Sequence, residues 1–279
     1  MKNILKISAS EGLCNCRIKQ YPDIDGNWVS VEQMISQKRI FNPSGLEKEG
    51  YENKGKFDSN SCVETDNKSS EEQSDNDRAL RRSRAKVYDI IRCNLDLGYF
   101  CTLTFNGEYI ARDDYTSVLK KFSAWCDNRV RRKGLKYLAV IEKHKESNGL
   151  HFHVLCNDVL SLVDSGTVKV PKRKKPIKIA TADRYKIPLE DRKTVYNITD
   201  WIWGFSTAIQ ITGDDCRVKV ANYLRKYLTK DSDKIGGRYY YSGGALVRPR
   251  YLYTNADFYD CEETYYINVP GNTIKVLKI

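Results

Sequence analysis

The chain has 279 residues, of which 41% are hydrophobic, and it carries a formal net charge of +11 with a pI near 9.1. Its nine cysteines, an odd number without a Cys-x-x-Cys pair, argue against a disulfide framework and a zinc ribbon, so we expect a reducing cytoplasm. Residues 2–10 lack the apolar core of a signal peptide, and no apolar run is long enough to span a bilayer, so we expect no membrane partner.

Composition divides the chain into four expected parts. Residues 1–43 form a small N-terminal segment. Residues 44–79 are rich in Glu, Asp, Ser, Asn and Lys, which is typical of a flexible linker. Residues 80–255 form the main domain, and residues 256–279 form a tail of two short strands.

The main domain alternates helical and strand-like segments. Helical periodicity covers residues 81–95 and 114–132, and apolar runs with strand character cover residues 100–106, 136–142 and 149–155. This pattern predicts an α+β domain with a mainly antiparallel central sheet and flanking helices.

The third of these runs carries two of the three histidines of the chain, at alternate positions. Successive side chains of a strand point to opposite faces, so His151 and His153 are expected to project the same way. Such a pair suits a divalent metal ion. The alternative for an isolated His-x-His is two histidines satisfied within a core strand.

Glu142 ends the preceding run and extends this pattern. The turn residues Ser147, Asn148 and Gly149 predict an antiparallel hairpin, which can bring the Glu142 carboxylate beside both imidazoles. Two imidazoles and one carboxylate leave coordination positions open for a substrate oxygen, and the mixed nitrogen and oxygen set favours Mg²⁺ or Mn²⁺ over a structural zinc. The alternative for Glu142 is a solvated charge at a strand end.

Residues 220–230 predict a helix that begins near Gly213 and carries two tyrosines four residues apart. A lysine follows each of Tyr223 and Tyr227 by three residues, so each phenol has an ammonium group about one turn away. The ammonium groups can favour a phenolate or bind a phosphate. The alternative is an amphipathic helix with tyrosines at the edge of a core.

A His-hydrophobe-His strand followed by a Tyr-x-x-Lys-Tyr-x-x-Lys helix resembles the HUH endonucleases, specifically the rolling-circle replication initiators of phages and phage-like plasmids. Residues 100–106 look like the first motif of that family. Residues 201–205, 209–211 and 241–244 look like segments around its tyrosine helix. The resemblance runs from about residue 80 to 255, and it implies a catalytic domain with a central, mainly antiparallel five-stranded sheet flanked by helices.

The resemblance also implies roles. In that family a tyrosine attacks a DNA phosphodiester, which leaves a free 3′-hydroxyl and a 5′-phosphotyrosine on the protein. The implied metal ligands are His151, His153 and Glu142, and the implied catalytic residues are Tyr223, Tyr227, Lys226 and Lys230. The implied cofactor is Mg²⁺ or Mn²⁺. Relatives with a single catalytic tyrosine also exist, so the alternative is that one of these two tyrosines has only a structural role.

Charge favours DNA as the partner of this domain. Residues 1–80 contain 11 Lys/Arg and 14 Asp/Glu, whereas residues 81–279 contain 36 and 22. A positive field of this kind attracts a phosphate backbone. The residues expected to contact DNA are Arg129, Arg131, Arg132, Lys172, Arg173, Lys174, Lys175 and Arg225. The alternative for each basic cluster is a solvated face or loop.

The expected function is nicking and joining of single-stranded or supercoiled origin DNA in the cytoplasm of a bacterial host. No Walker A sequence is present, so strand separation would need a host helicase, and the free 3′-hydroxyl would need a polymerase. Two alternatives are a relaxase or transposase of the same chemistry, and an origin-binding repressor without catalysis.

Overall fold

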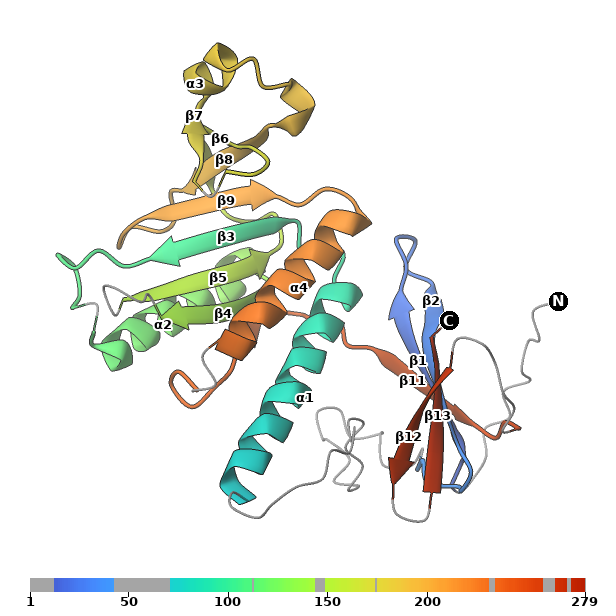
Figure 1. The fold of residues 1–279 in the computed structure, drawn as a ribbon. Coiled ribbons are helices and arrows are strands. Elements are labelled where there is room, and N and C mark those ends of the chain that lie inside the picture. The colour runs from blue at the N-terminus through green and yellow to red at the C-terminus, as the bar shows by residue number, and fades with distance from the viewer. Residues whose placement is uncertain are drawn as a thin grey trace. The chain divides into compact units, whose positions relative to one another are not determined.

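The structure is a computed structural model that describes residues 13–42, 71–111, 113–143, 149–173, 175–230, 234–257, 264–269 and 272–278. The chain divides into two compact units. One spans residues 72–247, and the other joins residues up to 71 with residues from 248 onward (Figure 1). Each unit contains its own antiparallel sheet, which confirms the α+β class. Within the described ranges, no helix has both the length and the apolar character of a membrane span.

The larger unit is built on an eight-stranded sheet. Its strands, in spatial order, are β10 (Tyr241–Gly243), β4 (Tyr137–Lys143), β5 (Leu150–Cys156), β3 (Tyr99–Thr104), β9 (Ser206–Gln210), β8 (Lys193–Ile198), β6 (Leu162–Lys169) and β7 (Ile177–Lys178). The expected five-stranded sheet is therefore not confirmed.

The three additional strands, β6, β7 and β8, come from the segment between β5 and Trp201, whose main basic cluster lies between β6 and β7. This segment also contains the short helix α3 (Ile179–Arg184) and the 3₁₀ turn η2 (Leu189–Asp191). It joins the rest of the sheet through the pairs Val195–Ile209 and Tyr196–Ala208. Val168, Val170 and Ala182 form a small core of its own.

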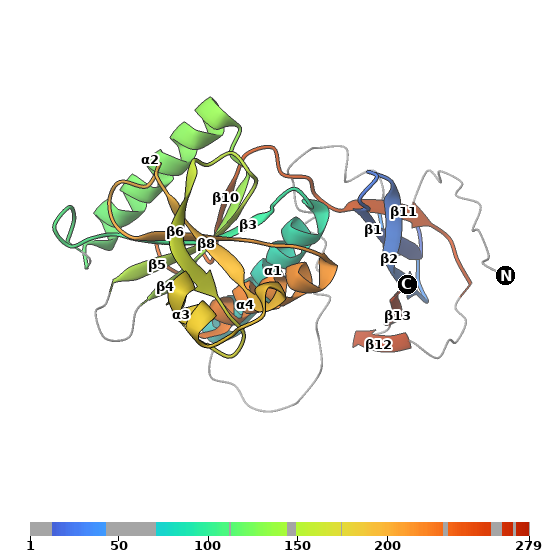
Figure 2. The same cartoon turned by 90° about the horizontal axis from the view of Figure 1, so that it is seen from above.

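Helices cover both faces of the central strands, which gives three layers. Helices α1 (Glu71–Cys93) and α4 (Asp214–Lys230) lie side by side on one face, and α2 (Tyr115–Lys133) covers the other (Figures 1 and 2). The ends of α2 follow from its sequence. The Asp114 carboxylate accepts from the Ser117 amide at 3.1 Å, and Gly134 ends the helix in the left-handed region with φ 68°.

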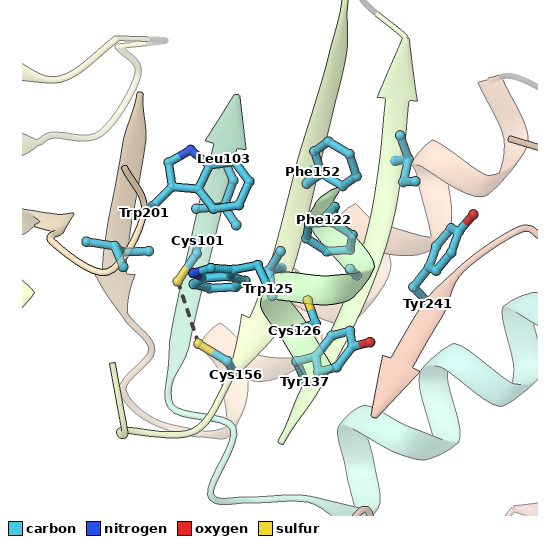
Figure 3. Packing of buried hydrophobic residues seen from close by; sticks show 14 of the residues in the cluster. Cys101, Leu103, Phe122, Trp125, Cys126, Tyr137, Phe152, Cys156, Trp201 and Tyr241 are labelled. Atoms are coloured by element: carbon cyan, nitrogen blue, oxygen red, sulfur yellow. Dashed lines mark hydrogen bonds between the residues drawn. The ribbon is translucent and has the colours of Figure 1, made fainter. Parts of the chain in front are cut away.

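Side chains alternate along the strands and so pack into the helical layers on both faces of the sheet. On β5, Phe152 and Val154 point toward α2, while Leu155 points toward α1 and α4. Phe122 of α2 stacks on Phe152 with ring centroids 4.1 Å apart, and Trp125 packs edge-on against Trp201 (Figure 3). The core of this unit is therefore rich in aromatic side chains, which hold β5 rigidly in place.

The smaller unit draws strands from both ends of the chain. Its five-stranded sheet has the order β11 (Arg250–Thr254), β1 (Cys16–Pro22), β2 (Trp28–Ser36), β13 (Asn272–Lys278) and β12 (Thr264–Val269). The tail thus forms the two expected strands, which pair with each other.

The observed unit boundaries differ from the expected ones at both ends of the main domain. Residues 248–255, expected within that domain, lie with the N-terminal strands. Residues 71–79, expected in the linker, form the first turns of α1. A charged, polar composition is as typical of an exposed helix as of a linker.

Candidate active site

The two histidines of β5 face α4. Phe152 and Val154 occupy the opposite face of the strand, and this leaves His151 and His153 on the face that α1 and α4 cover. His153 is buried, whereas His151 is partly exposed. The strand spacing thus brings the two imidazoles to one face of the sheet, as the sequence predicted.

Glu142 lies on the same face because β4 and β5 pair in antiparallel register. The register sets Glu142 opposite His151, so His153 is its diagonal neighbour. The Oε2 atom of Glu142 lies 3.0 Å from the Nε2 atom of His153. The structure therefore brings all three expected ligands to one patch of the sheet. His144 and the expected turn at 147–148 lie outside the described residues.

Helix α4 brings its tyrosines to this patch because its apolar stripe faces the sheet. Leu224 and Leu228 are buried against Leu138 and Leu155, and this orientation turns the neighbouring face of the helix toward His153.

The rings of the two tyrosines then surround His153. The ring of Tyr227 stacks on His153 with centroids 4.6 Å apart and planes at 28°, and the ring of Tyr223 meets it edge-on at 5.9 Å. The Tyr227 hydroxyl donates a hydrogen bond to the Tyr223 hydroxyl. Tyr223 is 41% exposed, so its phenol is open to a substrate.

The surroundings of Tyr227 favour the neutral phenol. Burial, the Tyr223 hydroxyl and the negative charge of Glu142 raise the pKa of Tyr227 well above its ordinary value. Tyr227 therefore needs a base or a positive charge nearby before it can act as a nucleophile.

The patch has the donor atoms for a divalent cation, although no group of three or more His, Cys, Asp or Glu side chains in the described residues is arranged as a metal site. Two ligands about 2.1 Å from one ion and about 90° apart are separated by about 3.0 Å. The same distance separates Nε2 of His153 from Oε2 of Glu142. Imidazole and carboxylate donors suit Mn²⁺ or Mg²⁺. The chemistry of the donors thus suits the expected ion, although His153 and Glu142 contact each other directly and the three side chains are not gathered around one point in the described residues.

The expected basic residues of α4 take different positions relative to the tyrosines. Lys226 is exposed in the turn after Tyr223, and the Arg225 guanidinium lies 5.5 Å from the centre of the Tyr88 ring of α1. Lys230 is the last residue of α4, and its side chain lies outside what the structure describes.

The structure does not bring Arg129, Arg131 and Arg132 to the tyrosines. All three belong to α2, which covers the opposite face of the sheet. Arg129 pairs with Asp200 at 3.5 Å, and Arg131 and Arg132 lie in the last turn of the helix, where cations stabilise its negative end. These contacts give the cluster a structural role that a run of charge in the sequence does not reveal.

The second basic cluster lies at the end of the β6–β7 hairpin. Lys172, Arg173 and Lys175 are exposed there, and the Arg173 guanidinium lies 5.2 Å from the centre of the Tyr185 ring. Lys174 lies outside the described residues. The cluster thus belongs to the extension of the sheet beyond β9 and is exposed to solvent.

Two residues near the histidines, Thr102 and Phe100, were not among the predicted site residues. Oγ1 of Thr102 lies 3.4 Å from Nδ1 of His153, and the Phe100 ring stacks on the same imidazole with centroids 5.9 Å apart. Both belong to β3 and sit on the histidine face because β3 pairs with β5. The sequence shows that Phe100 and Thr102 alternate along one strand, but it does not show that this strand pairs with β5.

The motifs of the sequence did not indicate a role for Arg217. It is buried at the start of α4 and donates to the backbone carbonyls of Asn94, Leu95 and Leu97, which follow α1, at 3.2, 2.6 and 3.4 Å. These bonds fix the start of the tyrosine helix. No feature of the sequence distinguishes this arginine from the exposed ones.

Comparison with known proteins adds one match. Residues 98–232 match the model of a family described as Replication-associated protein ORF2. This match supports a rolling-circle replication initiator. It spans β3 to the end of α4, and so includes both histidines, Glu142 and both tyrosines. It also supports replication initiation as the function and DNA as the partner. No curated protein and no solved structure matches the chain.

Proposed function

We propose that the protein is a metal-dependent HUH endonuclease that starts rolling-circle replication by nicking and rejoining origin DNA. The observation that carries the proposal is the position of Tyr223 and Tyr227 over His153, which in turn contacts Glu142. A candidate nucleophile and candidate metal ligands thus share one patch, and this patch lies within the segment that matches the replication family.

In the proposed reaction a tyrosine oxygen attacks a phosphorus atom of single-stranded origin DNA. The new O–P bond replaces the bond from phosphorus to the 3′-oxygen, which leaves with a proton as a free 3′-hydroxyl. The protein keeps the 5′ end as a phosphotyrosine. The exchange of one ester for another conserves the bond energy, so the strand can be rejoined without a nucleotide cofactor.

Five side chains have defined tasks in this scheme. His151, His153 and Glu142 hold Mg²⁺ or Mn²⁺, which when bound supplies electrophilic activation of a phosphate oxygen. Lys226 lies in the turn after Tyr223 and can place an ammonium near the phosphate or the phenol. Lys230 has the same spacing from Tyr227 in the sequence.

The two tyrosines suit two successive cleavages. Their rings are 4.7 Å apart, and a hydrogen bond joins their hydroxyls. One tyrosine can therefore hold a strand end while the other attacks a second phosphodiester at almost the same place. This arrangement would let one molecule both open and close a replicating circle.

DNA would reach the patch along exposed basic residues. Lys226 lies one turn after Tyr223, Arg225 adds a charge on the side of α4 that faces Tyr88, and Lys172, Arg173 and Lys175 offer a further set on the β6–β7 hairpin. A host helicase and polymerase in the bacterial cytoplasm would then separate and copy the strands.

The test is denaturing electrophoresis of the protein with labelled single-stranded DNA from its own origin, with Mn²⁺ and with EDTA. We expect a metal-dependent protein–DNA adduct that is lost when both Tyr223 and Tyr227 are changed to phenylalanine. Tyr109→Phe is the matched control, because Tyr109 is an exposed tyrosine outside this patch. Binding without an adduct would instead favour an origin-binding protein without catalysis.

A further inference from the structure

One face of the sheet in the smaller unit carries basic and aromatic side chains toward its edges, around a buried apolar centre. Directly paired residues of antiparallel strands share a face, and the register aligns Tyr253 of β11 with Arg17 of β1. The same row crosses β2 at Met34 and β13 at Val276, which are buried in a small core with Ile40 and Phe41, and it ends at Tyr265 of β12. The next row on this face pairs Tyr251 with Lys19. We call the surface formed by Arg17, Lys19, Tyr251, Tyr253 and Tyr265 the Arg17 face.

The cations of the Arg17 face are held between rings. The guanidinium carbon of Arg17 lies 5.2 Å from the centre of the Tyr251 ring and 5.4 Å from that of Phe41. The ammonium of Lys19 lies 5.3 Å from the centre of the Tyr21 ring. The order along this edge of the face is therefore ring, cation, ring, cation, ring.

These side chains remain open to solvent to different degrees. Arg17, Lys19, Tyr251 and Tyr253 are partly exposed, and Tyr265 is 46% exposed. The face is thus positioned by its contacts and still presents ring surface and positive charge to a ligand.

The charge of the smaller unit is complementary to that of a polyanion. Apart from Glu71 of α1, the described residues of the smaller unit include eight Lys/Arg and four Asp/Glu. Glu32 is the acidic residue of the two rows, and it is paired with Lys19 across the strands. A ligand that combines flat rings with regularly spaced negative charges would match both properties of the face. Single-stranded nucleic acid is such a ligand, since its bases stack on aromatic rings while its phosphates follow a basic surface.

We propose that the Arg17 face is a binding site for single-stranded DNA, separate from the tyrosines of α4. The choice of DNA rests on the proposed function. Tyr251, Tyr253 and Tyr265 would stack on bases, and Arg17 and Lys19 would contact phosphates. Because both units belong to one chain, a strand held by this face raises the local concentration of DNA for the catalytic unit.

Two neighbouring tyrosines provide a matched test. Tyr265 and Tyr266 are adjacent on β12 and 46% and 47% exposed, but they point to opposite faces of the sheet. Full-length protein with Tyr223→Phe and Tyr227→Phe, in EDTA, would be titrated against a fluorescein-labelled oligothymidylate, so that only non-covalent binding is measured. We expect Tyr265→Ala to weaken binding about tenfold and Tyr266→Ala to leave it unchanged. Equal losses in the two variants, or no loss in either, would overturn the proposal.

Salt dependence tests the charged half of the face. Each phosphate contact with a single strand contributes about 0.7 to the slope of log affinity against log salt, so Arg17→Gln with Lys19→Gln should make that slope shallower by about 1.4. Lys19→Gln alone leaves the packing of Arg17 in place and should account for about half of the change. Thermal melts identify a variant that fails to fold. An unchanged slope in a folded Lys19→Gln variant would contradict the proposal.

The result of this binding test can be separated from the result of the adduct test of the proposed function. The oligothymidylate experiment uses a background without the tyrosine hydroxyls, so it does not depend on cleavage. A Tyr265-dependent loss of binding in this background, together with no adduct between the wild-type protein and origin DNA in Mn²⁺, would support this site and refute the nicking activity. Adduct formation with identical binding by the Tyr265→Ala and Tyr266→Ala variants would do the reverse.

Discussion

Nε2 of His153 and Oε2 of Glu142 are 3.0 Å apart, and Tyr227 stacks on the same imidazole. One carboxylate thus acts on two groups. It contacts a candidate metal ligand, and its negative charge contributes to the raised pKa of a candidate nucleophile.

Glu142→Gln should separate these two effects. Loss of the anionic donor should raise the Mn²⁺ concentration needed for half-maximal adduct formation by at least about tenfold. Without metal, the same change should lower the pKa of Tyr227, because the negative charge that disfavours the phenolate is gone. Metal titration of the adduct assay and ultraviolet titration of the phenol, with Tyr227→Phe as the reference, measure the two effects. A Tyr227 pKa that stays the same or rises would contradict the electrostatic assignment.

Thr102→Val should weaken metal binding while leaving the fold intact. The Thr102 hydroxyl faces Nδ1 of His153 at 3.4 Å and can fix the ring so that Nε2 is free for a metal. Loss of such a partner costs about 10- to 100-fold in metal affinity, which calorimetric titration with Mn²⁺ would measure. Thr207→Val is the control, since Thr207 pairs with Thr102 from the far side of β3. Equal affinities in both variants would show that Thr102 does not orient the histidine.

The single tyrosine variants should differ in rate. Tyr223 is 41% exposed, whereas Tyr227 is partly buried and its pKa is raised. We therefore expect Tyr223→Phe to slow the first cleavage more than Tyr227→Phe, by about tenfold or more. Quenched time courses of adduct formation on an origin oligonucleotide measure this rate. A slower first cleavage in Tyr227→Phe would reverse the order of the two nucleophiles.

Arg217→Ala should destabilise the larger unit by about 2–4 kcal/mol, because it removes the buried Arg217 donor from the carbonyls of Leu95 and Leu97 and one of the two donors to the Asn94 carbonyl. Urea unfolding measures this loss. Arg225→Ala is the comparison, and its partly exposed contact with Tyr88 should contribute less than about 1 kcal/mol. Similar losses in the two variants would show that burial of Arg217 has no special weight.

Asp200 should make stability depend on acid pH. Partial burial opposes its ionisation, but the hydrogen bonds from Lys133 at 2.8 Å and the Ser161 amide at 2.9 Å, with the charge of Arg129, hold its pKa below the usual range. A lowered carboxyl pKa stabilises the fold above the ordinary Asp value, and this contribution is lost as pH falls through the folded-state pKa.

Asp200→Asn should therefore cost about 1–3 kcal/mol near neutral pH and progressively less in acid. Thermal melts of both proteins across this pH range measure the difference. A difference that stays constant with pH would mean that the charge of Asp200 does not contribute.

The sequence predicts local features of the site better than the long-range ones. The spacing of His151 and His153 and the apolar stripe of α4 depend on neighbouring residues, and both faces lie as that spacing indicates. The neighbours of β3 and the pairing of β11 with β1 depend on residues far apart in the chain, and no periodicity encodes them. The position of Arg129, Arg131 and Arg132 on α2 could not be predicted for a related reason, since a run of charge does not reveal which layer will carry it.

The pairing of β2 with β13 also has a consequence for synthesis of the protein. β1 and β2 leave the ribosome early, whereas β13 follows after the whole larger unit has been made. Until then β2 exposes an unpaired edge that can associate with other chains. Premature termination before residue 264 would leave residues 72–247 complete but would deprive the small sheet of β12 and β13. The sheet of the smaller unit is thus complete only after β12 and β13 have been translated. Truncated products would be prone to aggregate through β2.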